Sequence, residues 1–234
     1  MPEWNAPAWS ALFLHGGGGG GWEWNRWCGV WRAHGIQVHA PDLQPVSAGI
    51  EATEWDDYRG QVEAWLRALP RPRVLAGASL GGLLALQAAG GADALIVINP
   101  LLPAPWHREL PTRDWPDRVR WRGDARLSST RHAMPEADAA SVLYALRRWR
   151  DESGAVLRAA QAGIAIEALR CPALFVASRD DDDVPAQAVR RLAGRSGATC
   201  VEVAGGHLAP LLGRGAQRVA RQAVEWLNAP ACAV

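Results

Sequence analysis

Short apolar runs alternate with longer amphipathic segments along most of this 234-residue chain. The short runs consist of Val, Leu, Ile, Ala and Phe with few polar positions, which is typical of strands that are buried on both faces. We expect six such strands, at residues 10–14 and 36–40, in the run after Pro72, and at residues 94–98, 173–177 and 199–203.

The segments between these runs repeat their apolar residues at helical spacing. In residues 22–34, apolar side chains stand at positions i, i+3, i+4 and i+7, namely Trp24, Trp27, Cys28 and Trp31. Gly35 follows this helix and is expected to end it. Further helices are predicted at residues 53–69, after Gly81 to about residue 89, at 136–150, after Pro185 to about residue 193, and at 213–227.

This alternation predicts an α/β protein with a parallel sheet of about six strands and helices on both faces. The carboxyl ends of parallel strands meet at one edge of the sheet, and binding and catalytic groups gather there. A chain of this length suits one compact core rather than two independent domains. We expect residues 1–100 and 171–234 to form that core.

Residues 101–170 have a different composition, with five prolines, many arginines and four tryptophans. We predict that they form an insertion that acts as a helical lid, or cap, over the core. Two of the tryptophans, Trp106 and Trp149, are candidates for lining a substrate pocket. The second half, residues 136–150, is expected to be a helix with one apolar side, made by Val142, Leu143, Leu146 and Trp149.

The stretch from Arg73 to Leu86 combines a buried strand, a sharp turn and a helix, with Ser79 at the apex of the turn. Gly77 and Gly81 flank it, which gives the pattern Gly-x-Ser-x-Gly. A side chain at either glycine would collide with the neighbouring segment, because the apex residue adopts a strained backbone conformation. The turn presents the serine oxygen at the amino end of a helix, where developing negative charge is favoured. We interpret Ser79 as a nucleophile.

The composition excludes several classes of function. The formal net charge is +1 and the pI is about 7.8, so neither nucleic acid nor an anionic membrane is indicated as a partner. All 25 basic residues are arginine, which excludes Schiff-base chemistry on a lysine. The four cysteines are scattered without metal-ligand spacing, so we expect thiols, no metal and no cofactor.

The location and assembly of the protein are less constrained. The chain starts without the basic and apolar regions of a secretory signal, and no apolar run approaches the roughly 18 to 20 residues of a membrane span. We therefore expect a cytoplasmic protein that does not insert in a membrane. The oligomeric state does not follow from the sequence.

A serine hydroxyl becomes a good nucleophile only when a base takes its proton and a third group orients that base. His207 follows a predicted strand in a Gly-Gly-His loop, and aspartates 180–183 follow the strand before it. Both groups therefore belong at the same edge of the sheet as Ser79. Four adjacent aspartates could also suggest a divalent metal, but consecutive loop residues do not all point at one ion. An acidic turn that contains one catalytic acid is the favoured interpretation.

With these residues in place, the sequence resembles the α/β-hydrolase family over nearly its whole length. Four motifs stand at the positions that the family uses: His15-Gly16-Gly17, Gly77-Ala78-Ser79-Leu80-Gly81, Asp181-Asp182-Asp183-Val184-Pro185 and Gly205-Gly206-His207. The order serine, acid, histidine along the chain is also the one known for this fold.

The resemblance implies a role for each residue of the site. The family pattern Asp-x-x-Val-Pro selects Asp181 as the acid, with Asp180 as the second choice. Some relatives carry the acid after the preceding strand, but this chain has Asn99 there, and an amide cannot compensate the charge of an imidazolium. The backbone N–H groups of Gly17 and Leu80 are implied to form the oxyanion hole, in which each such donor is typically worth about 3 kcal/mol.

The sequence departs from the family pattern in two ways. Only about nine residues precede the first strand, so we expect the sheet to lack the amino-terminal hairpin of the family. The loop of six glycines, residues 16–21, is also unusually bare. Its flexibility could leave the oxyanion hole poorly preorganised, or it could let the backbone pack closely against a substrate. His15 is expected to shape this loop rather than to take part in the chemistry.

Together these features predict a serine hydrolase that cleaves a carboxylic ester or thioester through an acyl-enzyme. Ser79 attacks the acyl carbonyl, His207 takes and returns the proton, and Asp181 orients His207. The substrate is expected to be a small acyl compound, either free or bound to a carrier. Two alternatives stay open: the same triad used for carbon–carbon hydrolysis, a lyase reaction or acyl transfer, and a non-catalytic binding protein of the same fold.

Overall fold

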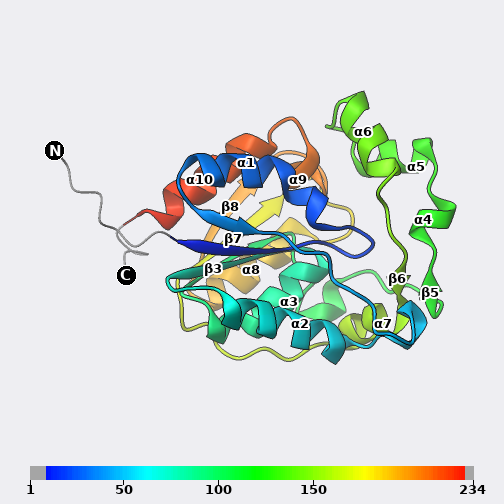
Figure 1. Ribbon diagram of the computed structural model, residues 1–234, viewed down its shortest axis with the longest axis horizontal. Helices are drawn as coiled ribbons and strands as arrows, with labels where there is room; N and C mark the ends of the chain where they lie inside the picture. The colour runs from blue at the N-terminus through cyan, green and yellow to red at the C-terminus, as the bar shows by residue number, and fades with distance from the viewer. Residues whose placement is uncertain (1–8, 230–234) are drawn as a thin grey trace.

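The centre of the molecule is a six-stranded sheet, seen in a computed structural model that describes residues 9–229 (Figure 1). The strand order is β2-β1-β3-β4-β7-β8. Their bounds are β1 Ser10–Leu14, β2 Gln37–His39, β3 Arg73–Ala78, β4 Ala94–Ile98, β7 Ala173–Ser178 and β8 Thr199–Val203. All five pairings are parallel, which confirms the predicted sheet. No antiparallel strand joins this sheet among residues 9–229. The expected lack of an amino-terminal hairpin also depends on residues 1–8, which lie outside the described residues.

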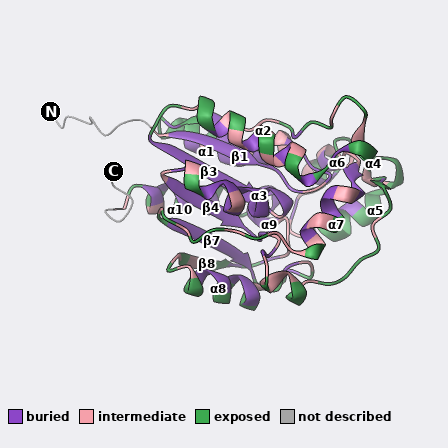
Figure 2. Ribbon diagram, turned by 90° about the horizontal axis from the view of Figure 1, so that it is seen from below, coloured by how far each residue is buried: buried purple, intermediate pink, exposed green. Residues whose placement is uncertain are grey.

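The register of the sheet brings the ends of its central strands together. Leu14 at the end of β1 lies opposite Gly77, and Ala78 at the end of β3 lies opposite Ile98. Every residue of β1, β3, β4 and β7 is buried, whereas the edge strands β2 and β8 have exposed positions. Figure 2 shows these buried strands between helices that are exposed on their outer sides. The loops that carry the predicted site residues therefore start from the carboxyl ends of a sheet whose four central strands are fully buried.

Helices cover both faces of the sheet, as predicted. Helices α2, α3 and α8 pack on one face, and α1 and α10 pack on the other, where Phe13 of β1 lies against Trp24, Trp27 and Trp31. The bounds of these helices are α1 Asn25–Ala33, α2 Trp55–Ala68, α3 Leu80–Ala88, α8 Ala186–Arg195 and α10 Ala216–Leu227. Short 3₁₀ turns accompany them: η1 Gly21–Trp24, η2 Ile50–Ala52 and η3 Ala89–Gly91.

Two predicted helices begin later than expected. The helix predicted from residue 22 starts as the 3₁₀ turn η1, and α1 follows from Asn25. The helix predicted from residue 213 is preceded by a separate turn, α9 Ala209–Leu212, and α10 starts at Ala216. Gly213 separates them in an extended conformation, which apolar periodicity alone does not reveal because both pieces bury apolar residues.

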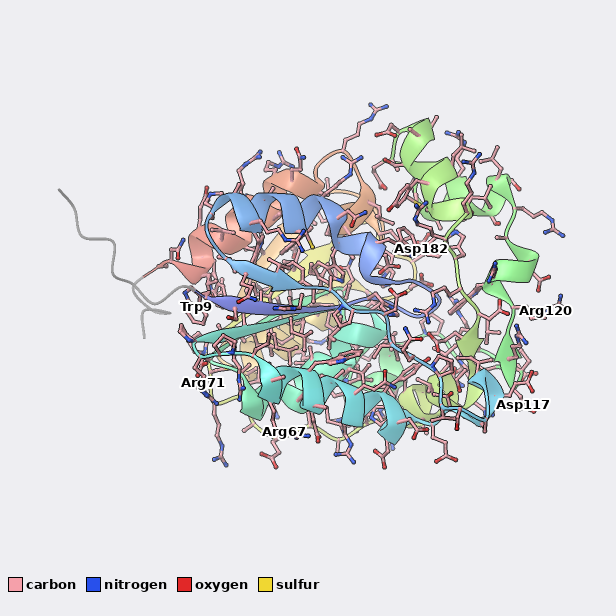
Figure 3. The ribbon with its side chains drawn as sticks, viewed as in Figure 1. Trp9, Arg67, Arg71, Asp117, Arg120 and Asp182 are labelled. Atoms are coloured by element: carbon pink, nitrogen blue, oxygen red, sulfur yellow. The ribbon has the colours of Figure 1, made fainter. Side chains whose placement is uncertain are left out.

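Residues 101–170, called here the inserted segment, lie between β4 and β7 and add no strand to the main sheet. The segment contains η4 Trp106–Glu109, β5 Arg118–Val119, α4 Trp121–Asp124, α5 Leu127–Ala133, α6 Ala139–Leu146, β6 Glu152–Ser153 and α7 Gly154–Ala162. Its two short strands pair antiparallel with each other. In Figures 1 and 3 the part from β5 to β6 stands at one end of the sheet, on the side of Asp182, while Trp9 and Arg71 mark the opposite end.

The helix predicted at 136–150 is shorter than expected and is turned on its axis. Helix α6 buries Val142 and Ala145, whereas Leu143 is 44% exposed, so the prediction that Leu143 belongs to the buried side was wrong. Val142 and Ala145 have the spacing i, i+3 and lie on one side of the helix. This buried side is rotated about the helix axis relative to the apolar side that was predicted. No helix among residues 9–229 is long and apolar enough to cross a membrane.

Candidate active site

Ser79 sits at the sharp turn between β3 and α3, in a backbone conformation that L-residues rarely adopt (φ 53°, ψ −118°). The flanking glycines are required by close backbone contacts. A Cβ on Gly77 would lie 2.1 Å from the Gly81 carbonyl oxygen, and one on Gly81 would lie 2.4 Å from the His15 carbonyl oxygen. The turn is therefore built from the backbone of its own five residues, 77–81, packed on the end of β1. These residues are called the serine turn below.

His207 and Asp181 meet at the same edge of the sheet. The Nδ1 of His207 donates to Oδ2 of Asp181 at 2.7 Å, and the Asp181 side chain is fully buried. The other oxygen, Oδ1, accepts the backbone N–H groups of Asp183 and Val184, each at 2.8 Å. Asp180 points elsewhere, since its Oδ2 accepts the N–H of Gly205 at 3.0 Å. The structure thus brings together His207 and the aspartate that the family pattern selected.

The electrostatics around His207 favour its protonated form. Burial alone would lower the pKa of this imidazole, but the hydrogen bond and charge of Asp181 act against burial, and so do the charges of Asp183 and Glu23. The net result is a pKa above the ordinary value for histidine. Because Nδ1–H is held by Asp181, Nε2 is the nitrogen that remains to accept a proton.

Asn99 ties the histidine to the strand next to the serine. It follows β4, has a positive φ of 42°, and is buried. Its Nδ2 donates to the His207 carbonyl oxygen at 2.8 Å and to Ser178 Oγ at 2.9 Å. The neighbouring backbone holds the serine, because the N–H of Ser79 donates to Ile98 and its carbonyl accepts from Leu101, both at 3.0 Å. The segment 98–101 therefore positions both predicted catalytic residues.

The six-glycine segment, residues 16–21 and called here the glycine loop, runs beside the serine. A Cβ built on Gly16 would lie 3.4 Å from the Cβ of Ser79. Gly17 is partly exposed while Gly16 and Gly18 are buried. Neither the Gly17 N–H nor the Leu80 N–H donates to a protein group among residues 9–229. Both predicted oxyanion donors are thus free of protein acceptors in the described part of the chain.

His15 has a structural place in this loop. Its Nδ1 donates to the Gly16 carbonyl at 2.7 Å and its Nε2 accepts the N–H of Leu43 at 2.9 Å. Burial lowers the pKa of His15 to about 4, so the ring is neutral near pH 7. With both ring nitrogens bonded to backbone, His15 shapes the loop, as expected from the sequence.

The tryptophans of the inserted segment take different places. Trp121 lies against the glycine loop, since a Cβ on Gly17 would be 3.2 Å from its ring. Trp149 packs edge-on against Trp22, and its Nε1 donates to Thr130 Oγ1 at 3.1 Å. Trp106 packs against the core with the Arg191 guanidinium 5.9 Å from its ring centre. A substrate-binding role of Trp106 and Trp149 stays a prediction.

Asn99 and Glu23 carry no recognised signal in the sequence for a place at the site, whereas Trp121 is one of the four tryptophans of the inserted segment. Glu23 is 2% exposed, accepts the Gly16 N–H at 3.0 Å, and has its pKa raised to about 7, mainly by burial. Its position between two tryptophans directly after the glycine loop was the only available clue. Asn99 stands where some members of the family carry the catalytic acid, and its amide gives no indication of the bond that it makes to His207.

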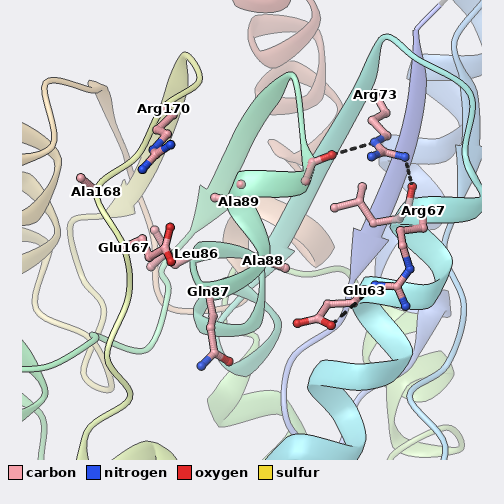
Figure 4. Close-up of a pocket in the computed structure, with 13 residues that line it drawn as sticks. Glu63, Arg67, Arg73, Leu86, Gln87, Ala88, Ala89, Glu167, Ala168 and Arg170 are labelled. Carbon is pink, nitrogen blue, oxygen red and sulfur yellow. Dashed lines mark hydrogen bonds and ion pairs between the residues drawn. The ribbon is translucent and has the colours of Figure 1, made fainter.

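Two cavities lie outside the serine turn. One of about 320 Å³ is lined by the ends of α2 and α3, the start of β3 and the end of the inserted segment, at the opposite end of the sheet from Ser79 (Figure 4). Arg73 crosses its wall and donates to the Leu66 and Gly91 carbonyls. A second cavity of about 280 Å³ lies between α6 and the start of α1, and Glu23 and Tyr144 are among the residues that line it.

A metal does not fit the acidic turn. Asp181, Asp183 and His207 offer ligand atoms within 4.8 Å of one another. However, Asp181 uses one oxygen for His207 and the other for two backbone N–H groups, while Asp183 pairs with Arg113. A cation would have to displace all of these partners, so the residues present fit a hydrogen-bonded pair better than a metal site.

Comparisons with known proteins agree with this fold. A family model described as the alpha/beta hydrolase family matches residues 11–222. No curated protein sequence matches the chain. Among proteins of known structure, the chain is similar to a pyrethroid hydrolase from Sphingobium faniae, with 22% identity, a TM-score of 0.74, and 96% of this chain and 99% of that one covered.

Two plant proteins are similar at lower identity. Tomato methylketone synthase I, complexed with 2-tridecanone, has 13% identity and a TM-score of 0.74 over 94% of this chain and 98% of that one. An Arabidopsis methylesterase has 15% identity and a TM-score of 0.69 over 93% and 99%. At these identities the likeness shows a shared fold.

Proposed function

Since the chain belongs to the alpha/beta hydrolase family, we propose that it is a serine hydrolase that cleaves a carboxylic ester or thioester. The observation that carries the proposal is the arrangement around Ser79. A strained serine follows β3 and has two N–H groups without protein acceptors near it, and an Asp–His pair follows β7 and β8 at the same edge of the sheet. A binding protein of the same fold has no need for this combination of groups.

In the proposed first step, Ser79 Oγ attacks the carbonyl carbon of the substrate while Nε2 of His207 takes the hydroxyl proton. Asp181 fixes the tautomer through Nδ1–H and stabilises the imidazolium that forms. The carbonyl oxygen becomes negative and accepts hydrogen bonds from the Gly17 and Leu80 N–H groups. The carbon–oxygen or carbon–sulfur bond then breaks, and the alcohol or thiol leaves with the proton from His207.

In the second step, water attacks the acyl-enzyme with His207 as the base. The bond to Ser79 Oγ breaks, the serine recovers its proton, and a carboxylic acid is released. The names of two structural neighbours, a pyrethroid hydrolase and a methylesterase, support a hydrolytic reaction on an ester. Release of one carboxylic acid per substrate would distinguish this reaction from a lyase or from acyl transfer.

Replacing Ser79 with alanine tests the proposal. We expect the rate on activated short-chain esters to fall at least about 10⁴-fold, because the nucleophile is lost. A fluorophosphonate probe should label wild-type Ser79 and not the variant. The matched control is Ser196→Ala, since Ser196 ends α8 and its hydroxyl donates only to the Leu192 carbonyl. Parent-like ester cleavage by Ser79→Ala, or no labelling of the wild type, would contradict the proposal.

A further inference from the structure

The glycine loop is held by carboxylates that come from three parts of the chain. The N–H of Gly16 donates to Glu23, that of Gly18 to Glu152 at 3.1 Å, and that of Gly21 to Asp42 at 2.7 Å. Gly17 therefore stands between two amides that are each bonded to a buried glutamate. Glu23 and Glu152 are both only 2% exposed.

Glu23 reaches back from η1 into the loop that precedes it. A Cβ on Gly19 would lie 1.9 Å from its Oε1, so the loop closes tightly around this carboxylate. The other charged groups that act on it are His207 and Asp42. Charge-assisted bonds from a carboxylate to backbone N–H are among the stronger hydrogen bonds in proteins. Glu23 thus fixes the peptide between His15 and Gly16, and the next peptide along the chain carries the Gly17 N–H.

Glu152 reaches the loop from β6 of the inserted segment. Its Oε1 accepts the Tyr58 hydroxyl at 2.9 Å and the Ser153 N–H at 2.8 Å, which leaves Oε2 directed at Gly18. The neighbouring Arg150 N–H donates to the Gly18 carbonyl at 2.7 Å. The inserted segment therefore binds Gly18 at both its N–H and its carbonyl, and the Trp121 ring covers the same residue.

Holding the glycine loop in this way lowers the stability of the folded protein for two reasons. Burial of a carboxylate is unfavourable, and it raises the pKa of both glutamates above the ordinary value. Each glycine of the loop also loses more conformational freedom on ordering than any other residue would. The buried carboxylates and the ordered glycines both lie beside Ser79. There the position of a backbone N–H determines how well an oxyanion is bound.

We propose that Glu23 and Glu152 are positioning residues, which hold the Gly17 N–H in place for the oxyanion by fixing the peptides on either side of it. The inference rests on the proposed function and extends it, because it makes the inserted segment part of the catalytic machinery. It also answers the question that the bare glycine loop raised, since the loop is ordered by distant side chains instead of its own.

Methionine variants test the proposal, because methionine keeps the length of glutamate without a strong acceptor. For Glu23→Met and Glu152→Met, we expect kcat on an activated short-chain ester to fall about 10- to 100-fold, with KM changed less than about threefold. Glu23→Gln keeps one acceptor oxygen for Gly16 and should retain kcat within about threefold. Rates are expressed per active site titrated with the fluorophosphonate probe, so that unfolded protein does not count.

A matched control distinguishes a specific effect on kcat from a general loss of stability. Val219→Ala removes buried volume from α10, far from the glycine loop, and should lower the melting temperature without changing kcat per titrated site. If a methionine variant does not fold, Glu23→Asp serves instead, because it withdraws the carboxylate by one methylene and should lower kcat about tenfold.

The outcomes distinguish this inference from the proposed function. Wild-type protein that is labelled and active, with methionine or aspartate variants of unchanged kcat, would overturn the positioning role and leave the hydrolase intact. A similar loss in Glu23→Gln and Glu23→Met would also overturn it, because the hydrogen bond would then be irrelevant. No labelling of the wild type would overturn both.

Discussion

The two halves of the candidate oxyanion hole are built in opposite ways. Leu80 belongs to the serine turn, where five consecutive residues form close backbone contacts with one another and with the end of β1. Gly17 belongs to the glycine loop, which has no side chains and takes its order from carboxylates elsewhere in the chain. One half is therefore a local motif, and the other is a product of the tertiary fold.

The difference shows which kind of site a sequence can reveal. A sharp strand-to-helix turn needs glycines at the same two positions in every protein that has it. The spacing of such a motif can therefore be recognised in a single sequence. A loop held from a distance leaves no spacing to recognise, since its partners are free to come from any element. Of three predictions, the first tests the local half, the second tests the acid that pairs with His207, and the third tests the distant half.

The largest effect is expected from Gly81→Ala, which breaks the local half. The added Cβ would lie 2.4 Å from the His15 carbonyl and 2.5 Å from the Leu14 carbonyl, and backbone cannot move aside. We expect a loss of about 3 kcal/mol or more in the free energy of unfolding, and no measurable esterase activity. Urea denaturation and ester hydrolysis measure the two effects.

The matched control for Gly81 is Gly194→Ala, because Gly194 lies in α8 with open space around its Cβ position. Alanine there should be neutral or stabilising by up to about 1 kcal/mol. Equal stability of Gly81→Ala and Gly194→Ala would show that the serine turn does not depend on its own glycines.

A smaller but still large effect is expected from Asp181→Asn, which tests the histidine partner. An amide keeps the size of the side chain but cannot stabilise the imidazolium or enforce its tautomer, so kcat should fall about 10²- to 10⁴-fold. The neighbouring Asp180→Asn should change kcat less than about threefold, since Asp180 bonds the Gly205 N–H instead. The reverse ranking in steady-state kinetics would assign the acid to Asp180.

The smallest effect on activity is expected for Glu23→Gln in the distant half, where the measured change is a dependence of stability on pH. Its pKa is about 7 in the folded protein against an ordinary 4.5, so the folded state holds a proton that the unfolded state releases. The stability that this proton gives is complete below pH 4.5 and is lost as the pH rises through 7. Glu23→Gln does not titrate, so it should gain about 3 kcal/mol relative to wild type over this range.

Urea unfolding of both proteins at pH 4.5, 6 and 7.5 measures this difference, and groups shared by the two proteins cancel. Glu63→Gln is the control, because Glu63 is a partly exposed residue paired with Arg59 and Arg67 on α2. Its difference from wild type should vary by less than about 0.5 kcal/mol over the same range. A constant difference for Glu23→Gln would show that the pKa of Glu23 is the same in the folded and unfolded protein, as for a solvated group.

Much of the fold was predictable because its signals are local. Strands β4 and β8 have the bounds that their apolar runs indicated, and the serine turn has the expected strained apex. The loop that carries His207 follows β8, as predicted, because parallel strands bring their carboxyl ends to one edge of the sheet. The pairing of His207 with Asp181 follows the family pattern rather than any spacing that physics alone dictates.

The rest depended on contacts between residues far apart in the chain. Glu152 is 134 residues from Gly18, and Glu136, whose Oε1 accepts the Gly206 N–H at 2.8 Å, is 70 residues from it. In a sequence each is one acid among 24 acidic residues. The buried face of α6 was predicted wrongly for a similar reason. The rotation of a short helix about its axis depends on the elements that it packs against.

The pairing of β5 with β6 has a practical consequence for redesign. Arg118 lies opposite Ser153, so the chain between them leaves and returns at a single point. Residues 120–151 are therefore a natural cassette, whose replacement would exchange the surroundings of Ser79 while the sheet and its loops keep their sequence. Any substitute has to supply three things that this cassette provides now. These are a flat ring over Gly18, as in Trp121, a backbone N–H for the Gly18 carbonyl, as in Arg150, and an acceptor for the Gly206 N–H, as in Glu136.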